Sequence, residues 1–202
     1  MAVTREEFAV LTALAGGVPD KALSPSAIRS CEESGLISGQ HLSAAGEEAL
    51  APYRVTNAII MAAGLSQRFA PISYERPKGL LHVRGEILIE RQISQLQDAG
   101  IDDITVVVGY KRELFSYLAD KYGVSLVVND EYATRNNNST LWVARHALAN
   151  TYICCSDNYY LDNPFERYVF ESFYSTPFVE GPTDEWCVTT APDGSISSVT
   201  IG

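Results

Sequence analysis

Basic residues are scarce in this chain. Its 202 residues include 15 lysines and arginines against 25 aspartates and glutamates, which gives a formal net charge of −10 at pH 7. A surface that neutralises the phosphates of a nucleic acid needs an excess of positive charge. The composition therefore argues against nucleic acid as a partner, and the cations that are present are expected to act locally.

Cysteines and long apolar runs are also few. Cys31, Cys154, Cys155 and Cys187 have neither the spacing of zinc ligands nor that of a small secreted disulfide framework. No apolar run approaches the roughly 20 residues that span a bilayer, and the N-terminus lacks a basic segment followed by an apolar core. We therefore expect a cytoplasmic protein with no membrane insertion.

The first part of the chain carries the signals of short helices. Thr4 and Glu7 form a capping-box pattern, and Ser24 with Pro25 marks a second helix start. The run at residues 35–50 resembles the last helices of bacterial regulators with a winged-helix fold. Because this region holds fewer basic than acidic residues, we expect residues 1–54 to form a winged-helix-like helical module that packs against the chain or binds a protein partner rather than DNA.

Strand and helix patterns alternate from residue 57 onward. Apolar, β-branched runs predict four buried strands, at residues 58–62, 104–108, 126–128 and 152–155. Amphipathic segments predict helices at residues 86–99, 114–123 and 141–148, and a hairpin is expected at residues 185–201. The sequence thus predicts an α/β domain over residues 55–202 with a mostly parallel sheet, whose ligand site lies beyond the carboxyl ends of the strands.

The loop after the first strand combines small residues with cations. Ala63, Gly64 and Leu65 follow the strand directly, so backbone N–H groups can approach a ligand without obstruction by large side chains. Arg68 and Lys78 add two positive charges. The pattern predicts an anion site, and we assign Arg68 and Lys78 to the phosphates of a nucleotide as catalytic residues.

Asp157 ends an otherwise apolar strand. A carboxylate in that place is costly unless it is solvated or coordinated. Magnesium takes hard oxygen ligands and keeps several waters, so one or two carboxylates suffice to hold it. Asp157 is therefore the predicted catalytic ligand of Mg²⁺; the structural alternative is an aspartate that caps a turn with Asn158.

The spacing A-A-G-x-x-x-R-F followed by P-K-x-L resembles the signature of nucleotidyltransferases that join an NTP to a phosphorylated small molecule. Further matches narrow the resemblance to the bacterial CTP:phosphocholine cytidylyltransferases: Tyr132-Ala133, Thr140-Leu141, Asp157-Asn158-Tyr159 and Glu185-Trp186. This resemblance implies a Rossmann-like nucleotidyltransferase fold. It also implies transfer of CMP from CTP to phosphocholine, or to a similar aminoalcohol phosphate, with release of pyrophosphate.

The resemblance also implies roles for individual residues. Gly109, Tyr110, Asn137 and Thr140 would line the base pocket and complete the nucleotide-binding set begun by the loop at 63–65. A quaternary ammonium cannot donate hydrogen bonds, so it is recognised by aromatic faces and nearby carboxylates. The residues that we assign to this substrate group are Tyr159, Glu185 and Trp186.

The sequence departs from the family pattern at two points. The family more often places two aspartates at this strand end, whereas Cys155 stands here in place of the first. The related enzymes also continue beyond the point that corresponds to Gly202 and supply another magnesium carboxylate from there. We therefore expect the nucleotidyltransferase domain to be C-terminally incomplete. Either the chain is a fragment of a longer polypeptide with a further C-terminal segment or domain, or it is a truncated homologue with impaired catalysis.

Two other functions stay open. The same loop motif occurs in sugar-1-phosphate nucleotidyltransferases, although the aromatic residues after Asp157 disfavour a sugar site, which needs polar side chains for the hydroxyls. The second alternative is a non-catalytic regulatory module, in which the N-terminal helices bind a partner and the nucleotide site only senses its ligand.

Overall fold

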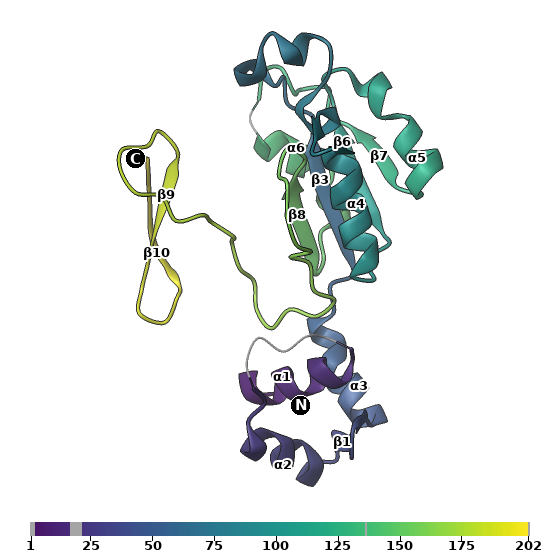
Figure 1. Cartoon of the computed structure of the whole chain (residues 1–202), viewed down its shortest axis with the longest axis vertical. Coiled ribbons are helices and arrows are strands. Elements are labelled where there is room, and N and C mark those ends of the chain that lie inside the picture. The colour runs from purple at the N-terminus through teal and green to yellow at the C-terminus, as the bar shows by residue number, and fades with distance from the viewer. Residues whose placement is uncertain (1–2, 17–21, 136, 202) are drawn as a thin grey trace. The chain divides into compact units, whose positions relative to one another are not determined.

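A computed structural model describes residues 3–16, 22–135 and 137–201 (Figure 1). The chain divides into two compact units, Met1–Glu171 and Ser172–Gly202. None of the helices in the described ranges is long and apolar enough to cross a membrane.

The larger unit begins with the three short helices that the sequence predicts. They are α1 (Arg5–Leu14), α2 (Pro25–Glu33) and α3 (Ala44–Leu50), and the strands β1 (Ile37–Ser38) and β2 (His41–Leu42) form an antiparallel pair between α2 and α3. The capping box at the start of α1 is confirmed, because the Thr4 side chain accepts a hydrogen bond from the backbone of Glu7 and the Glu7 side chain bonds the backbone of Thr4. The assignment of this region to the winged-helix fold stays a prediction.

A four-stranded parallel sheet follows. It consists of β3 (Asn57–Ala62), β6 (Ile104–Val108), β7 (Ser125–Val128) and β8 (Thr151–Cys155), in the order β7-β6-β3-β8. The four predicted strands and their parallel direction are confirmed. The two central strands are the most apolar ones, as expected of strands covered on both faces.

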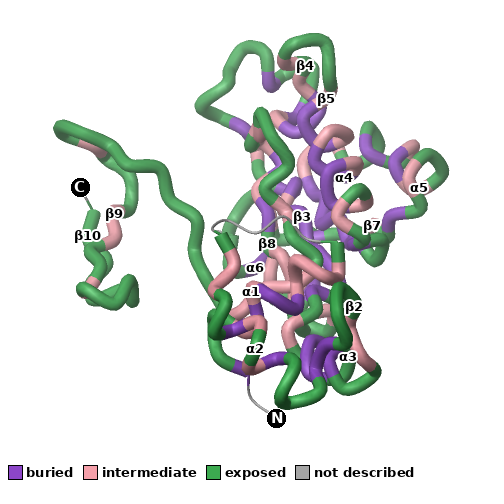
Figure 2. Tube along the Cα trace, turned by 60° about the horizontal axis from the view of Figure 1, so that its bottom comes forward, coloured by how far each residue is buried: buried purple, intermediate pink, exposed green. Residues whose placement is uncertain are grey.

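Helices cover both faces of this sheet (Figure 1). Successive residues of β3 pack with the helices of opposite faces. Ala58 and Ile60 belong to the main core, which includes residues of α4 (Leu88–Asp98) and α5 (Tyr117–Tyr122), whereas Ile59 packs with the residues of and after α6 (Asn137–Val143). Figure 2 shows buried trace in the sheet and α4, and again in the N-terminal helices α1 and α3, which form a second core cluster.

The boundaries of three helices differ from the sequence prediction. The helix predicted at 114–123 begins only at Tyr117, because its first predicted residues form the 3₁₀ turn at Arg112–Phe115. Glu86 and Ile87 form β5, which pairs with β4 (His82–Val83), because Arg84 and Gly85 both have positive φ and turn the chain into a tight hairpin. The predicted helix at 141–148 ends at Val143, and a separate 3₁₀ turn, η6 (Arg145–Ala147), follows it.

Short 3₁₀ turns lie in several of the connections in this unit. They are η1 (Ala51–Tyr53), η2 (Gln67–Phe69), η3 (Ile72–Tyr74), η4 (Lys78–Leu80) and η5 (Arg112–Phe115). Three of them, η2, η3 and η4, lie in the loop after β3, so this long connection is folded rather than extended.

The smaller unit, Ser172–Gly202, contains the predicted hairpin. Strands β9 (Trp186–Thr190) and β10 (Ile196–Ile201) pair in antiparallel fashion, with a register shift near Ile196. Asp193 accepts hydrogen bonds from the backbone and side chain of Ser195 and thereby fixes the turn.

Candidate functional site

A cavity of about 190 Å³ lies at the carboxyl ends of β3 and β8. Its lining comes from β3, the loop after β3, the start of α6 and the end of β8. The lining residues are Met61, Ala62, Gly64, Ser66, Arg68, Pro77, Lys78, Gly79, Asn137, Cys155, Ser156 and Asp157. The structure thus brings five predicted site residues together: Gly64, Arg68, Lys78, Asn137 and Asp157.

The loop after β3 is closed by two close contacts. Ser66 adopts the left-handed conformation at φ 57°, and its hydroxyl accepts a hydrogen bond from the backbone N–H of Lys78 at 3.2 Å. Gly79 then passes so close to β8 that a Cβ in its place would lie 2.9 Å from the Cβ of Ser156. Together these contacts return the chain to the end of β8 and place Lys78 beside Asp157.

Lys78 and Asp157 form an ion pair in the cavity. The Lys78 Nζ atom lies 2.6 Å from Asp157 Oδ2, and the two side chains are 24% and 29% exposed. The ring of Phe69 lies 5.5 Å from the same ammonium group. The ammonium is therefore flanked by a carboxylate and an aromatic face while a part of it stays accessible to an anion.

Cys155 contributes an uncharged thiol to the cavity lining. Burial raises the pKa of the Cys155 thiol, and the negative charge of Asp157 raises it further, whereas Lys78 lowers it. The thiol is consequently protonated at neutral pH and adds no negative charge beside Asp157.

The donor groups of the cavity fit a magnesium ion that arrives with a nucleotide. Asp157 supplies one carboxylate, and Ser66, Ser156 and Asn137 supply further oxygen atoms in the lining. Within residues 3–16, 22–135 and 137–201, no group of three or more histidines, cysteines, aspartates or glutamates could hold a metal alone. A single carboxylate matches the preference of Mg²⁺ for phosphate oxygens and water over an all-protein cage.

Three other residues that were predicted to bind the nucleotide instead stabilise the loop after β3. The Tyr110 backbone N–H donates to Ala63 O at 3.1 Å, and the Tyr110 hydroxyl donates to Ser73 O at 3.2 Å. Gly109 leaves no room for a side chain, because a Cβ would lie 2.8 Å from both Ala63 O and Tyr132 Cβ. Ala63, Gly109 and Tyr110 thus fix the loop without lining the cavity. Leu65 is half-buried beside Gly64 and is not among the lining residues either.

Thr140 is used inside the fold. It is buried, and its hydroxyl accepts a hydrogen bond from Asn129 Nδ2 at 3.1 Å, while Ser139 accepts a second one at 3.0 Å. Asn129 itself is fully buried at the end of β7, and its Oδ1 accepts from the backbone of Glu131. These bonds anchor the first turn of α6, which carries Asn137 into the cavity lining.

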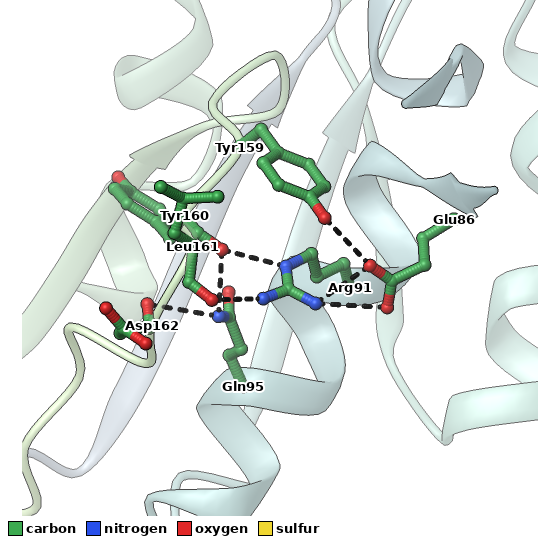
Figure 3. A network of polar contacts seen from close by, with 7 residues as sticks. All are labelled: Glu86, Arg91, Gln95, Tyr159, Tyr160, Leu161 and Asp162. Carbon is green, nitrogen blue, oxygen red and sulfur yellow. Dashed lines mark hydrogen bonds and ion pairs between the residues drawn. The ribbon is translucent and has the colours of Figure 1, made fainter. Parts of the chain in front are cut away.

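The aromatic residues assigned to a choline group are not among the residues of this cavity. The Tyr159 hydroxyl donates to Glu86 at 3.0 Å, and its ring faces the guanidinium of Arg91 at 4.8 Å (Figure 3). Glu185 and Trp186 belong to the smaller unit, where Trp186 is 69% exposed. The substrate role of these three residues stays a prediction.

Sequence reasoning missed several residues that shape the site. Ser66, Gly79 and Ser156 set the loop closure, and Asn129 anchors α6. The signal for Gly79 was available, since it is the glycine directly after Lys78. Asn129 also had a signal, since it directly follows a predicted strand, where ligand sites of parallel sheets lie. The serines gave no such signal, because their residue type is common in any turn.

The family model for the MobA-like NTP transferase domain matches residues 58–194. A choline-phosphate cytidylyltransferase of Streptococcus pneumoniae is 41% identical over 144 residues, which cover 71% of this chain and 63% of that enzyme. A 2-aminoethylphosphonate cytidylyltransferase of Lancefieldella rimae is 40% identical over 151 residues, which cover 73% of this chain and 61% of that enzyme.

A solved structure agrees with these matches. The structure of the CTP:phosphocholine cytidylyltransferase from Streptococcus pneumoniae superposes with a TM-score of 0.70 at 40% sequence identity, over 73% of this chain and 64% of the other. The chain thus spans less than two thirds of the length of these relatives. The family match covers more than half of the chain and includes the whole cavity loop and Asp157. The chain belongs to the MobA-like NTP transferase family.

Proposed function

We propose that this chain carries the nucleotide site of a cytoplasmic cytidylyltransferase, which transfers CMP from CTP to phosphocholine or a similar aminoalcohol phosphate and releases pyrophosphate. The relatives that are about 40% identical act on choline phosphate and on 2-aminoethylphosphonate. Both acceptors pair a phosphorus oxyacid with an amine or ammonium group. This shared chemistry supports an aminoalkyl phosphate or phosphonate as the acceptor.

The observation that carries the proposal is the meeting of Arg68, Lys78 and Asp157 in one cavity. Nucleotidyl transfer is an in-line attack of a phosphate oxygen on the α-phosphorus of the NTP, so the main barrier is accumulated negative charge. Arg68 and Lys78 supply positive charge from the loop. Mg²⁺ bound with the nucleotide would be held by Asp157 and would neutralise phosphate charge.

Lys78 would pair with Asp157 in the free protein and with a phosphate oxygen once the nucleotide is bound. In the free protein the ammonium lies against the carboxylate at 2.6 Å. An incoming triphosphate offers a stronger anion, so the ammonium would turn to a phosphate oxygen and release the Asp157 carboxylate for the metal. Lys78 would thereby couple binding of the phosphates to binding of the metal.

Titration calorimetry with CTP, UTP, ATP and dTTP, each with excess Mg²⁺, tests the nucleotide part of the proposal. We expect CTP to bind most tightly and Lys78→Met to weaken its binding about tenfold or more, since a charge-assisted hydrogen bond contributes roughly 1.5–3 kcal/mol. Lys111→Met is the matched control, because Lys111 lies over the ring of Tyr110 and not in the cavity lining. Equal binding of all four nucleotides, or none, would contradict the proposal.

Release of pyrophosphate tests the reaction itself. The protein is incubated with CTP and Mg²⁺ together with phosphocholine, 2-aminoethylphosphonate or glucose 1-phosphate. The proposal expects pyrophosphate with one of the two amine-bearing acceptors and none with the sugar phosphate. Turnover with the sugar phosphate alone would instead identify a sugar nucleotidyltransferase, and CTP binding without any turnover would favour a nucleotide sensor.

A further inference from the structure

Helix α4 buries two glutamine side chains. Ile89, Ile93 and Leu96 carry its apolar stripe into the core, whereas Gln92 and Gln95 are only 1% and 7% exposed on a neighbouring stripe. Buried polar side chains normally pair their polar atoms. Within the described part of the chain, the Oε1 atoms of both glutamines have no hydrogen-bond partner. The interactions of these two amides are therefore made by their Nε2 donors.

The Gln92 donor bonds the turn that carries Asp157. Gln92 Nε2 lies 3.0 Å from Cys155 O and 3.4 Å from Asn158 O. The backbone N–H of Asn158 donates to Cys155 O at 3.4 Å, which closes a turn with Ser156 and Asp157 at its centre. Gln92 thus bonds the carbonyl groups at both ends of the turn.

Two neighbouring side chains of α4 bond the segment that follows the turn (Figure 3). Gln95 Nε2 lies 3.3 Å from both Tyr160 O and Asp162 O. Arg91 donates from Nε to Tyr160 O at 2.8 Å and from Nη2 to Leu161 O at 2.6 Å. Of these three side chains, Gln92 is the one bonded to the turn, so it has a task that Gln95 lacks.

We propose that Gln92 is a positioning residue. It holds the turn at residues 155–158 so that Asp157 faces the cavity, and it thereby sets the affinity for the metal-bound nucleotide. This inference rests on the proposed function of the cavity. Carboxylates that hold a metal are themselves oriented by hydrogen-bonded neighbours, and loss of such a neighbour weakens metal binding about 10- to 100-fold. A methionine would fill the same space but would leave both carbonyl groups without their Gln92 donor.

Hydrogen exchange of the protein without ligand tests the positioning directly. In Gln92→Met, we expect exchange of the Asn158 amide to accelerate about tenfold, because that amide closes the turn. Gln95→Met removes the same kind of buried amide from the same helix and should leave the Asn158 amide unchanged. Unchanged exchange in Gln92→Met would overturn the inference. Gln92→Asn, with a shorter amide, replaces it if the methionine variant does not fold.

Calorimetry then tests the consequence for the metal. In Gln92→Met, we expect the affinity for CTP with Mg²⁺ to fall about tenfold, while the affinity for CTP in EDTA stays at the wild-type value. Gln95→Met should match wild type in both titrations. If wild type binds CTP with Mg²⁺ and Gln92→Met binds it equally well, the inference alone is wrong. If wild type shows no metal-dependent CTP binding, the proposed function fails and the inference fails with it.

Discussion

Gly64 and Gly79 line the same cavity but differ in the space around them. A Cβ at Gly79 would lie 2.9 Å from the Cβ and 3.0 Å from the Oγ of Ser156, whereas a Cβ at Gly64 would meet nothing within 4 Å. The close approach of Gly79 to β8 is what places Lys78 beside Asp157. A side chain at position 79 must therefore separate the loop from the strand.

This difference predicts opposite results for two alanine variants. Gly79→Ala should lower the free energy of unfolding by about 1–3 kcal/mol, the usual cost of forcing extra atoms into a packed contact. Gly64→Ala should leave it unchanged. Urea unfolding followed by circular dichroism measures both values. Equal stability of the two variants would show that the loop passes β8 less closely than the structure has it.

The charges around Cys155 predict its reactivity toward alkylating agents. Because burial and Asp157 raise the pKa of this thiol, its thiolate fraction at neutral pH is below that of an ordinary cysteine, and alkylation should require a higher pH. Asp157→Asn removes a charge that raises the pKa and should shift the pH profile of alkylation downward. Lys78→Met removes a charge that lowers the pKa and should shift the profile upward.

Mass spectrometry after timed treatment with iodoacetamide between pH 7 and pH 10 gives the rate at Cys155 separately from the other cysteines. The control is Lys111→Met, which removes a charge outside the cavity and should leave the profile in place. Shifts of the same sign in both cavity variants would contradict the arrangement of the two charges.

At the scale of the elements, the N-termini of α1 and α2 form a natural comparison. Both helices begin after a hydroxyl residue, Thr4 for α1 and Ser24 for α2. The Thr4 side chain accepts a hydrogen bond from the backbone of Glu7, whereas Ser24 makes no such cap bond and instead pairs with the Ser26 hydroxyl. The same residue class therefore stabilises one helix end through its side chain and the other through its backbone geometry alone.

We expect Thr4→Ala to lower the free energy of unfolding by about 1 kcal/mol and Ser24→Ala to lower it by much less. The effect should depend on pH. The hydrogen bonds from the Thr4 backbone and from Ser30 hold the pKa of Glu7 below its ordinary value, so Glu7 contributes stability above its unfolded pKa and loses it as the pH falls through the lower folded pKa. Chemical unfolding at pH 7 and pH 3 measures both effects. A cost for Thr4→Ala that does not shrink in acid would argue against the capping box.

The helices and strands also show how much of the fold could be predicted from the sequence. Apolar runs predicted all four strands of the sheet, because strands buried on both faces leave a simple pattern. The start of α4 was placed too early, since the apolar spacing continues through β5, and only the Arg84-Gly85 turn before β5, which pairs it with β4, marks it as a strand. The end of α6 was placed too late for the related reason that Ala144 and Leu148, which flank the following 3₁₀ turn, keep a helical spacing with Leu141.

The candidate site likewise contains residues that could be predicted from the sequence and residues that could not. The grouping of Arg68, Lys78 and Asp157 was predictable. The two cations follow a loop of small residues after the first strand, and a carboxylate at the end of an apolar strand is costly without a task. The residues that orient them were not. Ser66 and Gln92 act through hydrogen bonds to backbone groups far away in the sequence, and neither residue type stands out in its local pattern.

At the scale of the larger unit, an aromatic cluster joins its N-terminal helices to the segment that leads away from the cavity. The rings of Phe8, Tyr53 and Phe170 lie within 5.2–5.5 Å of one another. Backbone hydrogen bonds run beside them, from Val55 N to Arg167 O and from Val169 N to Tyr53 O. The helices therefore hold the chain that follows β8, and residues 1–54 are packed into the same compact unit as the sheet.

This packing predicts that the larger unit unfolds in one cooperative transition as long as the aromatic cluster is intact. Phe170→Ala should lower the free energy of unfolding by about 1–3 kcal/mol, less than a fully buried phenylalanine costs, because the ring is half-buried. It should also broaden or split the calorimetric transition, since the N-terminal helices lose their main contact with the rest of the unit. Phe178→Ala is the matched control, because Phe178 is 89% exposed in the smaller unit. A single sharp transition at the wild-type temperature in Phe170→Ala would mean that other contacts couple the helices to the sheet, and the cluster would then be a contact without a part in the cooperativity of the unit.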